Sequence, residues 1–249
     1  MYRFEVCANS VESCLAAQDG GAQRVELCAG IPEGGTTPSY GEITAARQLL
    51  RIGLHIIIRP RGGDFLYNEQ EIRIMEEDIR MARQAGVDGV VFGCLTPNGH
   101  IDIPNTKRLV EAAQGLSVTF HRAFDVCADP HQALEELVAL GINRILTSGQ
   151  QPTALQGLPL LKELVQKAAN RIVILPGSGI NENNIRQIAQ ESKVREFHFS
   201  AREKRESGMV YRRTQISMSA PGMPDEYTRN VTTTERVRAT INALRNHEG

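Results

Sequence analysis

The chain has 249 residues, of which 41% are hydrophobic and 23% are charged, and this balance predicts a globular protein with a substantial core. The formal net charge of −1 argues against nucleic acid as a partner, and no apolar run approaches the ~20 residues that span a bilayer, which argues against a membrane. Residues 1–7 lack the long apolar core of a signal peptide, and the five cysteines are scattered, with no C-x-x-C pair. We therefore expect reduced thiols and a cytoplasmic location.

Short apolar segments alternate with amphipathic helical segments along the chain. Asn68 with Glu71 predicts a helix cap, for example, and Ile72, Met75 and Ile79 then repeat at helical spacing. The eight expected strands are 4–8, 24–29, the isoleucine run 56–58, 89–94, 117–121, 143–148, 171–175 and 196–200.

Eight strand–helix units in about 250 residues predict a TIM (β/α)8 barrel, which we expect to be one domain over residues 1–249. A long loop is expected over residues 201–230, followed by a C-terminal helix from about Thr234. An open, doubly wound sheet is the alternative, but no G-x-G-x-x-G follows the first strand.

Several strands alternate apolar and polar residues, although strands covered on both faces are usually apolar throughout. If the apolar set faces the helices, the other set points into the barrel: Glu5, Glu26, Arg59, His121 and His198, with Cys7 and Cys28 one layer nearer the top. Buried charges need partners, so we expect an ion pair between Glu26 and Arg59 on neighbouring strands. His55 precedes its strand and is expected at the surface or the bottom face. A structural salt-bridge layer is the alternative, but buried ion pairs stabilise poorly, which favours a cluster that faces a ligand.

Charged residues also follow the third and fifth strands, where α/β folds place their ligand sites. Arg59 and Arg61 precede Gly62-Gly63 and Asp64, while Arg122 and Asp125 follow His121. His121 is a candidate general base or metal ligand. Arg122 and Asp125 are candidates for holding an anionic or hydroxylated ligand, or for pairing with Asp64 and Arg61 across the barrel mouth.

Small residues follow the last two strands of the predicted barrel. Gly177-Ser178-Gly179 comes after the seventh strand, and Ser200-Ala201-Arg202 comes after the eighth. In many barrels these loops bind phosphate through free backbone N–H groups. A tight turn that simply requires glycine is the alternative.

Cys7 and Cys28 lie at matching depth on adjacent strands, which run ~4.8 Å apart. Two facing thiols suit Cu(I), whereas zinc prefers four ligands. The alternative is that both thiols pack as small hydrophobic groups, as buried cysteines often do.

Several blocks of the sequence resemble the signature blocks of the CutC copper homeostasis family. They are Val25-Glu26-Leu27-Cys28, Glu33-Gly34-Gly35-Thr36-Thr37-Pro38-Ser39, Arg59-Pro60-Arg61-Gly62-Gly63-Asp64-Phe65, Thr119-Phe120-His121-Arg122-Ala123-Phe124-Asp125, Leu146-Thr147-Ser148-Gly149 and Glu196-Phe197-His198-Phe199-Ser200-Ala201. The resemblance implies a cytoplasmic TIM barrel that is usually oligomeric, a dimer or tetramer, and is linked to Cu(I). The two cysteines discussed for copper in this family correspond to Cys7 and Cys28.

Three hypotheses follow. The first is a copper homeostasis protein that binds Cu(I) through Cys7 and Cys28. The second is a barrel enzyme for a small anionic or phosphorylated substrate, in which His121 moves protons and Glu5 or Glu26 assists. Its ligand-binding residues would be Arg59, Arg61, Asp64, Arg122, Asp125, Ser148, Gly177, Gly179, His198 and Ser200. The third is an oligomeric scaffold with a vestigial site.

Overall fold

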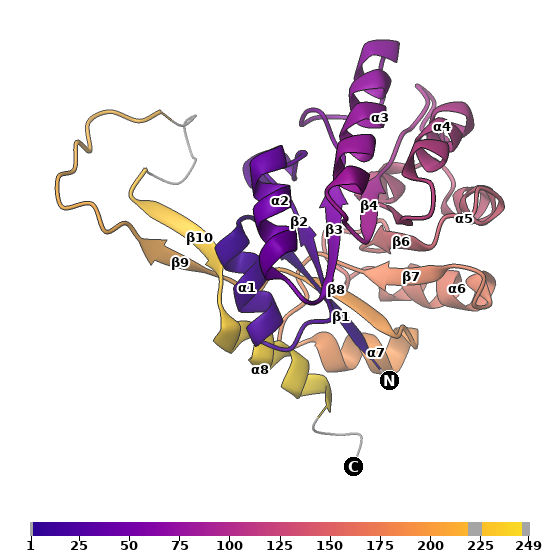
Figure 1. The fold of residues 1–249 in the computed structure, drawn as a ribbon. Coiled ribbons are helices and arrows are strands. Elements are labelled where there is room, and N and C mark those ends of the chain that lie inside the picture. Colours follow the sequence, from indigo (N-terminus) through magenta and orange to yellow (C-terminus); the bar gives the residue numbers. More distant parts are fainter. Residues whose placement is uncertain (1, 219–225, 246–249) are drawn as a thin grey trace.

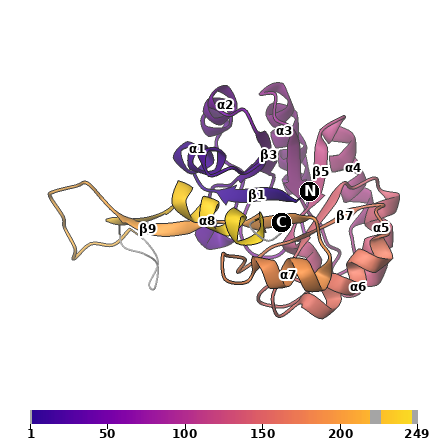
Figure 2. The same cartoon turned by 90° about the horizontal axis from the view of Figure 1, so that it is seen from below.

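The structure is a computed structural model that describes residues 2–218 and 226–245. Eight parallel strands form one sheet, and helices cover its outer side (Figures 1 and 2). The strands are β1 (Arg3–Ala8), β2 (Arg24–Leu27), β3 (Gly53–Ile57), β4 (Gly89–Phe92), β5 (Ser117–Phe120), β6 (Arg144–Thr147), β7 (Val173–Pro176) and β8 (Glu196–Phe199). The helices are α1 (Val11–Asp19), α2 (Tyr40–Leu49), α3 (Glu69–Gln84), α4 (Ile103–Ala113), α5 (Pro130–Ala139), α6 (Leu158–Ala168), α7 (Ile185–Ser192) and α8 (Thr234–Arg245).

The strands curve into a nearly closed barrel, which confirms the predicted TIM fold. They pair in the order β7-β6-β5-β4-β3-β2-β1-β8, so the first strand joins the last. The described part of β7 and β8 forms no backbone ladder, although the two strands lie side by side. Two 3₁₀ turns, η1 (Ile31–Glu33) and η2 (Arg122–Val126), occupy the loops after β2 and β5.

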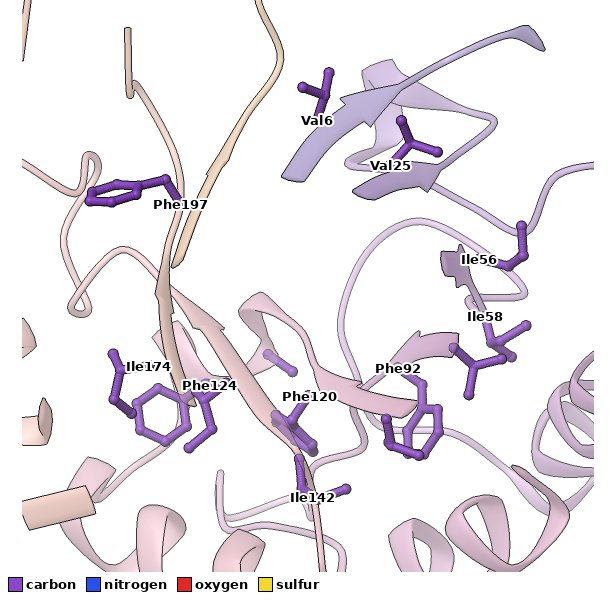
Figure 3. Packing of buried hydrophobic residues seen from close by; sticks show 14 of the residues in the cluster. Val6, Val25, Ile56, Ile58, Phe92, Phe120, Phe124, Ile142, Ile174 and Phe197 are labelled. Atoms are coloured by element: carbon purple, nitrogen blue, oxygen red, sulfur yellow. The ribbon is translucent and has the colours of Figure 1, made fainter. Parts of the chain in front are cut away.

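The apolar residues of the alternating strands pack outward against the helices, as predicted. Val6, Val25, Ile56 and Phe120 are fully buried in one cluster with residues of the helices (Figure 3). Because side chains alternate across a strand, the intervening polar residues must point into the barrel. None of the described helices has the length and apolar character required to cross a bilayer.

The predicted loop over residues 201–230 is partly wrong, because it contains an antiparallel hairpin. Strands β9 (Arg202–Glu206) and β10 (Thr228–Thr232) pair, and the hairpin extends away from the barrel (Figure 1). The sequence of β9, Arg-Glu-Lys-Arg-Glu, has no apolar alternation because its side chains are almost all exposed. Strand prediction from hydrophobic periodicity therefore fails here. The expected loop also covers residues 219–225, which lie outside the described part.

A charged layer closes the bottom of the barrel. Arg24 pairs with both Glu5 and Glu196, and Arg144 Nε lies 2.9 Å from Glu196 Oε2. His55 belongs to this layer: only 3% of it is exposed, and its Nδ1 lies 3.8 Å from Glu5 Oε2. Of the two expected positions, the bottom of the barrel is confirmed and the surface is wrong, because β3 begins at Gly53 and this places His55 inside the strand.

Candidate functional site

A cavity of about 440 Å³ opens at the carboxyl ends of the strands. Its wall contains two thiols, a carboxyl group, two imidazoles and a guanidinium that the sequence predicts to face inward, namely Cys7, Cys28, Glu26, His198, His121 and Arg59. The volume lies in the range of small-molecule sites. Most of the inward-facing polar residues therefore meet in one pocket.

The two predicted copper ligands lie together in this cavity. Cys7 Sγ is 3.8 Å from Cys28 Sγ, and neither cysteine forms a disulfide. Arg202 Nη2 donates to Cys7 Sγ at 3.1 Å. The pKa of the Cys7 thiol is well below its usual value because of its hydrogen bond with Cys28 and because His198 and Arg202 lie close by, which together outweigh its burial. The pKa of Cys28 is raised by that same hydrogen bond and by burial. Of the two thiols, Cys7 is therefore the one that loses its proton more readily.

His198 is held between two carboxyl groups. Its Nδ1 lies 2.6 Å from Glu5 Oε1, and its Nε2 lies 3.6 Å from Glu26 Oε2. One donor atom each from Cys7, Glu26 and His198 fit within 4.8 Å of one another. Although burial opposes it, hydrogen bonds to Cys7 and Glu5 raise the pKa of His198 well above its usual value. Glu5 does not line the cavity, so it cannot contact a ligand there as predicted. Its role is to position His198.

The predicted ion pair between Glu26 and Arg59 does not form. Arg59 follows the end of β3, and its guanidinium donates instead to the carbonyl oxygens of Glu33, Gly35 and Gly63 at 2.7–3.0 Å. It also lies over the ring of Phe65, 5.0 Å from the centroid. Glu26 is left with one buried oxygen, Oε1, that has no partner among the described residues. Burial raises the pKa of Glu26 to about 8.

His121 is fixed by the backbone that follows it. Its Nδ1 accepts a hydrogen bond from the amide of Ala123 at 3.2 Å, at the start of η2. Its Nε2 is buried without a partner in the described chain. Burial, reinforced by the charge of Arg59, lowers the pKa of His121 to about 3. The imidazole is therefore neutral and available as a hydrogen-bonding group, not as a cation.

The rim residues pair locally and not across the barrel mouth. Arg61 binds Asp64 and Glu71, and neither Arg61 nor Asp64 lines the cavity. Arg122 lines it and binds Asp125 at 2.7 Å. The alternative of pairs between Arg61 and Asp125 or Arg122 and Asp64 is wrong, because each arginine has an acidic partner three residues away. Ser148 donates to Asp125 and, like it, lies behind the cavity wall.

The loops after β7 and β8 form the remaining wall. Ser178, Gly179 and Ser200 line the cavity, whereas Gly177 does not. A Cβ at Gly177 would lie 2.6 Å from Leu146 Cδ1, so this glycine permits close packing. Arg236 from α8 also lines the cavity, and its Nη2 lies 3.3 Å from Glu182. No sequence signal marks Arg236, because helical spacing does not show which charged side chains reach back over a barrel.

Fold and cavity together define a (β/α)8 barrel with a polar ligand cavity at the strand ends, of the kind used by enzymes and binding proteins. The model of the CutC family matches residues 2–203, so the chain belongs to the CutC family. A family protein CutC from Bacteroides thetaiotaomicron is 64% identical over 98% of both chains. A human copper homeostasis protein cutC homolog is 49% identical over 98% of this chain and 89% of its own.

A solved structure supports the same assignment. The crystal structure of the putative copper homeostasis protein CutC from Streptococcus agalactiae is 42% identical. It superposes with a TM-score of 0.77 over 80% of this chain and 99% of that chain.

Proposed function

We propose that the protein binds Cu(I) through Cys7 and Cys28, with His198 Nε2 as a third donor, and acts in copper homeostasis. The observation that carries the proposal is the distance of 3.8 Å between the two sulfur atoms. Metal–sulfur bonds are about 2.3 Å long in zinc sites, so one ion can contact both thiols without a movement of the strands. Thiolates select soft ions such as Cu(I).

The surroundings of the thiols support this reading. The lowered pKa of Cys7 favours the thiolate form that a metal ligand requires, whereas His198, whose pKa is raised, must release its Nε2 proton when the ion binds. Glu5 Oε1 lies 2.6 Å from Nδ1 of His198, and metal-binding imidazoles are commonly held by a carboxylate at the nitrogen that faces away from the metal. The names of the human and streptococcal relatives refer to copper homeostasis. Free thiols also fit a reducing compartment, and we propose a cytoplasmic location on that ground.

Zinc is the second candidate, favoured by Glu26. The carboxyl group shares a cluster with Cys7 and His198, and Cys28 lies 3.8 Å from Cys7, so a shift of Cys28 toward this cluster would complete the four ligands that zinc prefers. Glutamate is a poor ligand for Cu(I) because its oxygen atoms are hard donors. The contribution of Glu26 therefore separates the two metals.

Anaerobic competition titrations against a chromogenic chelator test the proposal. Changing a residue that only supports a metal ligand typically lowers metal affinity about 10–100-fold, and Cys28→Ser should lower the Cu(I) affinity by more than this. Cys127→Ser, at a buried thiol outside the cavity wall, is the matched control. Glu26→Gln should leave Cu(I) affinity nearly unchanged and weaken Zn²⁺. Cu(I) binding that survives Cys28→Ser would refute the site, and a Zn²⁺ affinity that exceeds that for Cu(I) and depends on Glu26 would favour zinc.

A further inference from the structure

The cavity is far larger than a metal ion requires. Its volume of about 440 Å³ matches sites that enclose an organic molecule. The cysteine–histidine cluster occupies one wall, whereas Arg59, His121 and Phe65 lie on another part of the lining. These residues include strong hydrogen-bonding groups that the copper proposal does not use.

Arg122 and Arg236 on the lining pair with Asp125 and Glu182, but two other lining arginines, Arg59 and Arg202, have no carboxylate partner in the described chain. Arg59 is 4% exposed and forms no ion pair with a described acidic residue, only bonds to carbonyl groups. Arg202 also has no carboxylate partner in the described chain, and its buried Nε donates to none of the described acceptors. Burying the Arg59 cation without an anion is costly, so its position on the lining favours an anionic ligand.

The loop after β7 adds free backbone donors beside Arg202. The amides of Ser178, Gly179 and Ile180 donate to no acceptor within residues 2–218 and 226–245. Ser178 and Gly179 both have positive φ, 77° and 74°, and Ser178 is a residue type that rarely adopts this conformation. Successive amides in such turns form concave anion sites. All three residues line the cavity, and so do Ser200, which follows β8, and Arg202, the first residue of β9.

Two further side chains point to a bound molecule independently of this loop. Glu26 and His121 are 3% and 4% exposed, and both line the cavity. Each has a buried polar atom, Oε1 and Nε2, with no partner in the described structure. Native proteins leave few such atoms unpaired, so a ligand with hydroxyl or carbonyl groups fits between them.

We propose that the cavity binds a small organic phosphate, with its phosphoryl group between the amides of Ser178, Gly179 and Ile180 and the guanidinium of Arg202. The organic part extends toward Arg59, His121 and Phe65. A phosphoryl group suits the subsite because its several oxygens accept bonds from the amides and from a guanidinium at once. The phosphate subsite does not include the two thiols. The two sites are linked through Arg202, which also donates to Cys7 Sγ.

The first test uses inorganic phosphate as the probe on the reduced, metal-free protein. Phosphate should raise the melting temperature saturably relative to chloride at matched ionic strength. Amide resonances of Ser178, Gly179 and Ile180 should shift along the same binding curve. Absence of saturable binding, or shifts confined to other residues, would overturn the proposal.

Variants locate the site. Arg202→Gln should weaken phosphate binding about tenfold or more, because a charge-assisted bond is lost, and Arg202→Lys should restore part of the affinity. Arg171→Gln, on the outer surface in a pair with Glu135, is the control with the same loss of charge. Equal affinity in Arg202→Gln and Arg171→Gln would refute the subsite. Cys28→Ser should leave phosphate binding intact, so a failure of the copper proposal is recognised separately.

Discussion

Glu26→Gln should stabilise the protein at neutral pH, although Glu26 lies in the functional cavity. Burial raises the pKa of this carboxyl group to about 8, against an ordinary value of 4.5. Between these values the folded state binds one proton more than the unfolded state. The stability that Glu26 contributes is therefore complete below pH 4.5 and is lost as the pH rises toward 8.

The size of the effect follows from the shift. From pH 4.5 to pH 7 the wild-type protein loses about 3 kcal/mol through this group, at about 1.4 kcal/mol for each pH unit. Glutamine resembles the neutral carboxyl in shape but takes up no proton. The variant should therefore lose this pH dependence and exceed the wild type at pH 7 by up to about 3 kcal/mol.

Urea unfolding at pH 5, 6 and 7 measures both quantities. The wild type should lose stability over this range more steeply than Glu26→Gln, with unchanged m-values. Glu203→Gln, at an exposed carboxylate on β9, should keep the wild-type slope. Parallel slopes for Glu26→Gln and wild type, or a variant less stable at pH 7, would refute the assignment of a buried, protonated Glu26.

Three further predictions concern other parts of the barrel. The pKa of His121 is lowered to about 3 in the folded protein, so below pH 6.5 this residue binds a proton in the unfolded chain but not in the folded one. The wild type should therefore lose about 2 kcal/mol of stability through His121 between pH 7 and pH 5. Urea titrations of His121→Gln should not show this loss. Arg24→Met leaves Glu5 and Glu196 without this partner and should cost about 3–5 kcal/mol in urea unfolding, while a cost below about 1 kcal/mol would contradict a cooperative charged layer. Gly89→Ala places a Cβ 2.5 Å from His55 Nε2 and should lower the stability by about 1–3 kcal/mol, measured by thermal unfolding. Gly208→Ala, with open space around it, should change the stability little. Equal losses of stability in the two variants would contradict the steric argument.

Local patterns were sufficient to predict the barrel and the inward-facing residues. The alternation of Val6 and Val25 with Glu5 and Glu26 identified the two faces of β1 and β2, because a strand offers only two directions to its side chains. The closeness of the two thiols was predicted for the same reason, although the register places Cys7 opposite Glu26 and Cys28 just past the end of β2, and not at the matching depth expected.

Partner choice inside the barrel could not be predicted in this way. Glu5 pairs with Arg24 and His198, and Arg59 reaches loop carbonyls instead of Glu26. Which partners pair depends on how far each side chain extends and on where each strand ends, and the hydrophobic pattern predicts neither. The β9–β10 hairpin lacks such a pattern altogether, because it packs little of its surface on a core.

The missing ladder between β7 and β8 has a mechanical consequence. Among the described residues, separating these two strands breaks side-chain contacts but no backbone ladder, so we expect it to be the least costly way to widen the barrel. The loops that carry Ser178 and Ser200 follow these same strands. Amide protons along this seam should therefore exchange with solvent faster than those of β3 and β4, and ligands that bridge the two loops should slow that exchange. A bound anion would then hold the loops after β7 and β8 together and so stabilise this side of the barrel.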